Sequence, residues 1–159
     1  MFRDDHVRVT AVETSHFAQA VPATHSYGPD KAYAFRFDSA DGSVTFTGDT
    51  GPSEAVAALA RGSDVLVAEV CDFDSIRQAL LATEKPANLD ALLSHMREQH
   101  LSPEAVAQMA NAASVKKVVL THFVMGRGAD PEAIAAKVRA IFKGEVVAGR
   151  DLQSFAVAN

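Results

Sequence analysis

The sequence has few cysteines, no long apolar run and no excess of positive charge. Cys71 is the only cysteine among the 159 residues, which excludes an intrachain disulfide and a zinc site built on cysteines. No apolar stretch approaches the roughly 18 residues of a membrane-spanning helix, and the first residues lack the apolar core of a signal peptide. A net charge of −5 argues against a nonspecific nucleic-acid surface. We therefore expect a cytoplasmic protein with no membrane contact and no strong nucleic-acid signal.

Length and composition indicate one globular domain. A chain of 159 residues is long enough to bury a sizeable core. Its hydrophobic content of 48% and charged content of 22% are ordinary for a folded domain of this kind.

The order of the expected elements predicts an α/β fold. Strands are expected at residues 7–14, 32–38, 43–47, 64–70, 117–121, 145–148 and 152–156. Helices are expected at residues 52–61, 74–99 with an interruption near Pro86, 103–114 and 131–142. Strands and helices alternate after residue 43, which is typical of an α/β layer, while the turn at 40–42 adds an antiparallel hairpin. A mixed sheet with helices on one face (an α/β or α+β class) follows.

Three side chains capable of binding metal stand where expected strands stop. His16 follows the strand at 7–14, Asp49 follows the strand at 43–47, and His122 follows the strand at 117–121. Imidazole nitrogen and carboxylate oxygen are common zinc ligands. Strands that end in such residues bring them to one edge of a sheet, so we expect His16, Asp49 and His122 to lie close together.

Each of these residues also has an ordinary structural interpretation. Asp49 precedes Thr50-Gly51-Pro52 and is typical of a turn or a helix cap. A single histidine after a strand is usually only a polar terminus. The order of the three stretches makes the metal interpretation more specific than any one of them does.

Taken in order, Glu13-Thr-Ser-His16-Phe, Phe46-Thr-Gly-Asp49-Thr-Gly-Pro and Val118-Val-Leu-Thr-His122-Phe resemble the last three metal-binding motifs of the metallo-β-lactamase superfamily. The similarity is strongest to the branch of zinc-dependent hydrolases and phosphodiesterases. It implies one half of a four-layer αββα sandwich. It also implies that His16 binds a first metal, that His122 binds a second, and that Asp49 bridges them and orients the nucleophile. The implied cofactor is zinc, as one or two ions, with Mn²⁺ and iron as alternatives.

The earlier motif of that superfamily, His-x-His-x-Asp-His, does not occur in the 159 residues. The resemblance therefore implies a single domain over 1–159 that lacks its N-terminal half and exposes an apolar sheet face. A fragment of a longer enzyme, a degenerate gene product and a subunit that pairs with another chain all remain open. The expected partner is a second copy of the chain or a complementing N-terminal half. Three ligands can still hold one metal with a fourth position left for water.

Three further residues are candidates for a supporting role. His100 stands just before a helix, either as a plain surface residue or as a histidine at the edge of the site, as in similar tRNA-processing nucleases. Glu69 is expected either to orient a metal-binding histidine or to be a simple acid at a strand end. Ala68 occupies a position where those nucleases carry a histidine, which argues against tRNA 3′ processing. His25, in a loop with proline and glycine, is a candidate for the substrate entrance.

The leading functional hypothesis is a metal-dependent hydrolase that uses activated water to cleave an ester, a phosphodiester or a similar bond. Its substrate would be a small molecule or a phosphodiester. The alternative is a truncated, non-catalytic remnant that acts as an interaction or structural subunit. A third hypothesis, an unrelated α/β protein in which Asp49 only caps a helix, is the least consistent with the order of the motifs.

Overall fold

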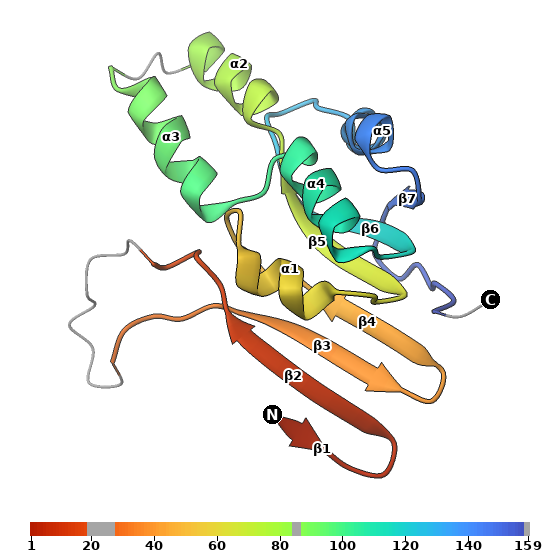
Figure 1. Cartoon of the computed structure of the whole chain (residues 1–159). Coiled ribbons are helices and arrows are strands. Elements are labelled where there is room, and N and C mark those ends of the chain that lie inside the picture. Colours follow the sequence, from red (N-terminus) through yellow and green to blue (C-terminus); the bar gives the residue numbers. More distant parts are fainter. Residues whose placement is uncertain (19–27, 84–86, 158–159) are drawn as a thin grey trace.

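The computed structural model describes residues 1–18, 28–83 and 87–157. These residues form one seven-stranded sheet in which the strands follow the order of the chain, β1 to β7 (Figure 1). The strands are β1 Phe2–Arg3, β2 Val7–Glu13, β3 Tyr33–Ser39, β4 Gly42–Phe46, β5 Val65–Cys71, β6 Lys117–Val124 and β7 Glu145–Ala148. Strands β1 to β4 pair antiparallel, and β4 to β7 pair parallel. The mixed sheet expected from the sequence is thereby confirmed.

The helices cover one face of this sheet. They are α1 Glu54–Ala60, α2 Phe73–Thr83, α3 Leu89–Gln99, α4 Pro103–Ala113 and α5 Pro131–Ile141. Helices α1, α4 and α5 pack on the sheet, while α2 and α3 pair with each other beyond the carboxyl end of β5 (Figure 1). The main core lies between the sheet and helices α1, α4 and α5, and it includes Leu66, Val106, Leu120 and Ile134. A smaller core of Cys71, Phe73, Leu89 and Leu93 lies under α2 and α3.

Local capping explains where the helices begin. The side chain of Ser102 accepts a hydrogen bond from the backbone N–H of Ala105 (3.1 Å), and that of Asp130 accepts one from Glu132 (3.0 Å). In each case a proline occupies the first turn, where its missing N–H costs nothing. Helix α1 starts after the cap Ser53 rather than at the expected residue 52.

The structure corrects the expected strands at both ends of the chain. Residues 152–156 form no strand, because the chain turns at Arg150 and Leu152 takes a left-handed φ of 63° that breaks any ladder. Conversely, Phe2 and Arg3 form a short strand that pairs with β2, where no strand was expected. Strand β6 runs beyond the expected end at Thr121, as far as Val124.

The face of the sheet opposite the helices is apolar and open. Tyr33, Phe35, Phe37 and Phe46 project from β3 and β4 on this face and remain 38–42% exposed. A groove of about 580 Å³ runs along it toward His122, and Phe155 and Val157 of the C-terminal segment line its wall. This is the exposed apolar sheet face that the sequence led us to expect. Within the described ranges, no helix has the length and apolar character needed to cross a membrane.

Candidate metal centre

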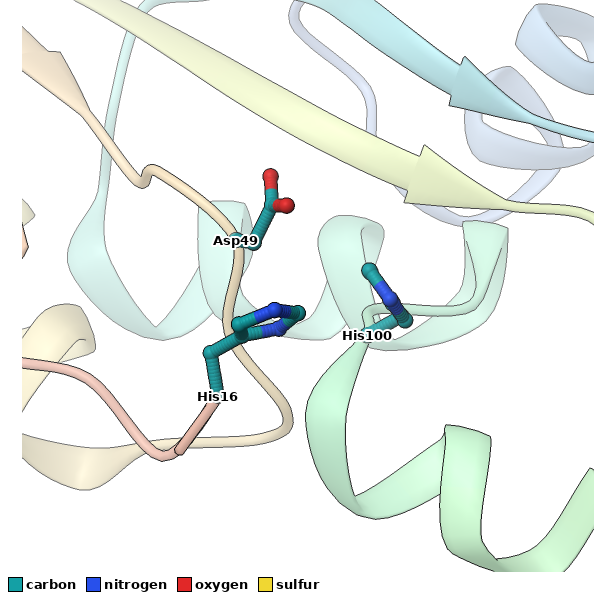
Figure 2. A group of neighbouring side chains, drawn as sticks. All are labelled: His16, Asp49 and His100. Atoms are coloured by element: carbon teal, nitrogen blue, oxygen red, sulfur yellow. The ribbon is translucent and has the colours of Figure 1, made fainter. Parts of the chain in front are cut away.

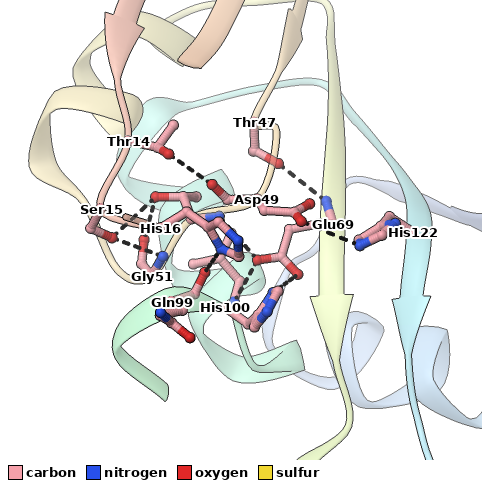
Figure 3. Close-up of polar contacts among 12 residues, drawn as sticks. Thr14, Ser15, His16, Thr47, Asp49, Gly51, Glu69, Gln99, His100 and His122 are labelled. Carbon is pink, nitrogen blue, oxygen red and sulfur yellow. Dashed lines mark hydrogen bonds and ion pairs between the residues drawn. The ribbon is translucent and has the colours of Figure 1, made fainter. Parts of the chain in front are cut away.

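The polar residues singled out in the sequence gather at one edge of the sheet. Asp49 lies in the loop between β4 and α1, His16 lies just after β2, and His100 lies between α3 and α4 (Figure 3). His122 comes from β6 on the other side of Asp49. The carboxyl ends of the parallel strands β4 to β6 meet at this edge, which is where open α/β sheets place their ligands.

Asp49 is held in place through its backbone. The preceding residue, Gly48, has a φ of 57°, and a β-carbon at this position would stand 2.8 Å from the carbonyl oxygen of Tyr33, so only glycine fits. The hydroxyl of Thr14 donates a 2.8 Å hydrogen bond to the carbonyl oxygen of Asp49. The end of β2 therefore directly supports the loop that carries the carboxylate.

The segment that carries His16 is bound to the same loop and to the end of α3. The hydroxyl of Ser15 accepts a hydrogen bond from the N–H of Gly51 (2.9 Å) and donates one to the carbonyl oxygen of Glu98 (3.2 Å). The Nδ1 atom of His16 lies 3.2 Å from the carbonyl oxygen of Gln99. This contact orients the ring and turns its other nitrogen away from α3.

Glu69 is a buried acid within β5, two residues before its end, and both of its carboxylate oxygens have polar partners. Its Oε1 accepts hydrogen bonds from the backbone N–H groups of Thr50 (3.2 Å) and Leu101 (3.0 Å). Its Oε2 lies 3.2 Å from Nδ1 of His100. That hydrogen bond raises the pKa of His100, and it outweighs the opposing effect of burial. Glu69 is therefore no simple acid at a strand end, and His100 is no plain surface residue.

His122 reaches the site because β6 contains a bulge. Thr121 pairs with Glu69 and Phe123 pairs with Val70, so His122 has no partner in the ladder, and its φ is 42°. A bulge of this kind redirects a side chain at the edge of a sheet. The Nε2 atom of His122 lies 3.4 Å from Oδ2 of Asp49, and the ring remains 58% exposed.

Three of these side chains form a group with the geometry of a metal site. His16, Asp49 and His100 each offer a potential ligand atom within 4.8 Å of the other two (Figure 2). The rings of His16 and His100 meet edge to face, with centroids 5.0 Å apart. Two imidazoles and one carboxylate are a donor set that suits zinc and leaves a position open, as in catalytic zinc sites. The residues present therefore fit one divalent ion.

The structure brings together most of the residues expected from the sequence. Asp49 lies beside both His16 and His122, as expected, although their role as metal ligands stays a prediction. His25 lies outside the described residues. What the sequence did not reveal is that His100, rather than His122, completes the compact group. One signal was available: an acid such as Glu69 inside an apolar strand requires a polar partner when it is buried.

Comparison with known proteins decides the family. The family described as "Beta-lactamase superfamily domain" matches residues 1–123 of this chain. The chain belongs to the metallo-β-lactamase superfamily. The resemblance inferred from the three metal motifs is thereby confirmed, and with it the fold class.

Curated relatives within this superfamily carry the name ribonuclease Z. The protein of that name from Mycobacterium tuberculosis is 31% identical over 152 residues, which cover 93% of this chain and 48% of the relative. The one from Bacillus velezensis is 36% identical over 107 residues, or 66% of this chain and 30% of the relative. The chain spans about half the length of the curated relatives that match it along most of its length.

Solved structures of the superfamily share the fold. The metallo-β-lactamase fold protein YhfI from Bacillus subtilis superposes with a TM-score of 0.64 at 17% identity, covering 92% of this chain and 48% of its own. Human tRNase Z, short form, superposes with a TM-score of 0.56 at 19% identity, and the match covers 96% of this chain and 43% of the human chain. At sequence identities this low, the superpositions show a shared fold and nothing about function.

Proposed function

We propose that this metallo-β-lactamase-fold chain carries the metal-binding part of a metal-dependent hydrolase that cleaves a phosphodiester or a similar ester. The observation that supports this most directly is the convergence of His16, Asp49 and His100, with His122 in contact with Asp49. These side chains come from four separate segments, and hydrogen bonds from Thr14, Ser15 and Glu69 hold the loops that carry them at this edge of the sheet.

Each residue has a distinct role in this proposal. His16, Asp49 and His122 bind metal, and Asp49 lies between the two histidines, where it can also orient the nucleophile. A zinc ion bound there would supply Lewis-acid chemistry, which activates water for attack at neutral pH. Glu69 fixes the ring of His100 at the edge of the site, so the position of that ring does not depend on substrate.

The name of the curated relatives favours a phosphodiester over other esters as the bond that is cleaved. Two features of this chain argue against extending the proposal to tRNA 3′ processing. Ala68 stands where similar tRNA-processing nucleases carry a histidine, and the net charge of −5 provides no general attraction for RNA. A small phosphodiester is therefore the substrate class that we propose.

The open aromatic face supports a second part of the proposal, namely that the site is completed by another sheet. The groove on this face is lined by Phe46, Val67 and Thr121 and reaches His122. A layer packed there would approach the side of His122 and Asp49 that this chain leaves uncovered. That layer would be a second copy of the chain or a complementing N-terminal half.

The same face supports the alternative function, a non-catalytic subunit that contributes only an interaction surface. Four aromatic side chains at 38–42% exposure are typical of a surface that binds another protein layer. This alternative does not explain why buried Glu69 holds the loops beside Asp49 and His100.

The test is hydrolysis of bis(p-nitrophenyl) phosphate, and of p-nitrophenyl acetate for comparison, with added zinc. We expect slow, zinc-dependent turnover from the chain alone, because few ligands hold the ion. Turnover should increase when the N-terminal half of the M. tuberculosis relative is supplied as a separate chain or a fusion. Asp49→Ala should reduce it to background, while Asp41→Ala, in an exposed turn, should leave it unchanged. Absence of zinc-dependent turnover in every combination would favour the non-catalytic alternative.

A further inference from the structure

The environment of His100 determines which of its two ring nitrogens carries a proton. Its Nδ1 faces the carboxylate of Glu69 at 3.2 Å, and an ionised carboxylate can only accept hydrogen bonds. Nδ1 therefore carries the proton, and Nε2 is the nitrogen with a lone pair to offer. A metal-binding histidine typically has this arrangement, with its second nitrogen donating to a carboxylate or a backbone carbonyl.

His16 has the same arrangement from the opposite side. Its Nδ1 lies 3.2 Å from the carbonyl oxygen of Gln99, which is also only an acceptor, so Nδ1 again carries the proton and Nε2 has the lone pair. The two rings stand edge to face with their centroids 5.0 Å apart. Asp49 completes the group, with its ligand atom within 4.8 Å of both (Figure 2).

One buried carboxylate positions two of the three segments. Glu69 binds the N–H of Thr50, which directly follows Asp49, and the N–H of Leu101, which directly follows His100. Its side chain is only 2% exposed, so this orientation is fixed by the fold. The distance between Asp49 and His100 is thus set by hydrogen bonds that are present without any ligand.

We propose that His100 is itself a metal ligand, and that it binds a divalent cation through Nε2 together with His16 and Asp49. This inference rests on the proposed function, since it assumes that the site takes a metal, and it changes which histidine completes the site. His122 is the weaker candidate for this first ion. Its ring is 58% exposed against 13% for His100, and within the described ranges its one polar contact is with Asp49. Its place is on the far side of Asp49, where it is available to a second ion.

The experiment is proton NMR of the complete chain loaded with Co²⁺, a paramagnetic substitute for zinc. Each histidine that binds through Nε2 keeps an exchangeable proton on Nδ1, and this proton gives a strongly shifted signal that disappears in D₂O. We expect His100→Gln to remove one of these signals. We expect His95→Gln, on the exposed face of α3, to remove none.

Affinity for Co²⁺, measured by competition with a chromophoric chelator, provides the second measurement. His100→Gln should weaken binding at least as much as the roughly 10- to 100-fold that is typical for loss of a residue that orients a ligand. Glu69→Gln keeps the shape of the side chain but removes its charge, and it should weaken binding by roughly 10- to 100-fold while leaving the number of shifted signals unchanged. If His100 only supported the fold, His100→Gln would lower the affinity for Co²⁺ without removing a shifted signal, as is expected for Glu69→Gln.

The outcomes distinguish this inference from the proposed function. If His100→Gln keeps every shifted signal and full affinity while His122→Gln loses one, His122 is the ligand and the inference is wrong, although a metal site remains. If no Co²⁺ binds, or if binding is insensitive to His16→Gln and Asp49→Asn, the proposed function fails as well. If His100→Gln does not fold, His122→Gln still decides the question. Two remaining shifted signals, from His16 and His100, support the inference, and a single remaining signal, from His16 alone, overturns it.

Discussion

Gly51 lies directly against the backbone carbonyl oxygen of Glu98, so closely that a β-carbon at position 51 would overlap this oxygen. The contact joins the loop that carries Asp49 to the end of the helix that precedes His100. Ser15 closes the same junction, since its hydroxyl bonds both Gly51 N and Glu98 O. The segments that carry all three members of the proposed metal group therefore meet around a residue without a side chain.

The first prediction is that Gly51→Ala weakens metal binding without touching any ligand. The added methyl must push the two loops apart, and overpacking of this kind costs about 1–3 kcal/mol of stability. We expect affinity for Co²⁺ to fall at least tenfold, measured by chelator competition alongside urea unfolding. Gly128→Ala is the control, because no atom lies within 4 Å of its missing β-carbon and only backbone strain is added. Equal Co²⁺ affinity in the two variants would refute the role of this junction.

The second prediction concerns Asp64, at the start of β5. Lys116 (2.6 Å) and the N–H and hydroxyl of Ser43 (2.7 and 2.9 Å) all donate to its carboxylate, and they lower its pKa to about 2. Because the folded pKa lies below the unfolded value of about 3.9, the carboxylate stabilises the fold above pH 4. This contribution disappears as the pH falls from 4 toward 2.

Asp64→Asn should therefore lower the free energy of unfolding by about 1–3 kcal/mol near neutral pH. The difference from the parent chain should shrink steadily below pH 4. Urea unfolding between pH 2 and pH 7 measures it, with Asp41→Asn in the exposed turn as the matched control. A difference that stays constant with pH would show that the charge of Asp64 is not what matters.

The third prediction is that Cys71 does not react in the folded protein. The thiol is fully buried at the end of β5, and burial raises its pKa to about 12, so almost no thiolate exists at pH 8. Ellman's reagent should label it slowly in buffer and at once in urea, as followed by absorbance. Immediate labelling of the native chain would mean that the small core under α2 and α3 opens readily.

The fourth prediction is that the chain associates with itself through its open sheet face. Phe35 and Phe46 are direct partners on β3 and β4, and both are about 40% exposed. Sedimentation velocity should show dimers or larger species that become monomers in a Phe35→Ser, Phe46→Ser double variant. Leu92→Ser, which removes a comparably exposed side chain from α3, should change nothing. A well-behaved monomer of the parent chain would contradict the prediction.

Much of this molecule could be predicted from local sequence. Ser102-Pro103 and Asp130-Pro131 predicted the starts of α4 and α5, because capping and proline geometry depend only on neighbours in the chain. The apolar run at 64–70 predicted β5 for a similar reason, since a strand needs only a suitable pattern. The short β1 and the absence of a strand at 152–156 could not be predicted, because strand pairing depends on whether a partner edge is available.

The site likewise has features that local sequence predicts and features that depend on the tertiary structure. The sequence by itself determined that His16, Asp49 and His122 stand near the ends of strands, because that position follows from the run of apolar residues before each of them. Only the tertiary structure decided that Glu69 bonds His100, that a bulge redirects His122, and that His100 joins His16 and Asp49. These relationships depend on the register between β5 and β6 and on the path of α3 across the sheet edge. Long-range packing sets both, so the apolar strand around Glu69 could indicate that this acid needs a polar partner but not which residue it is.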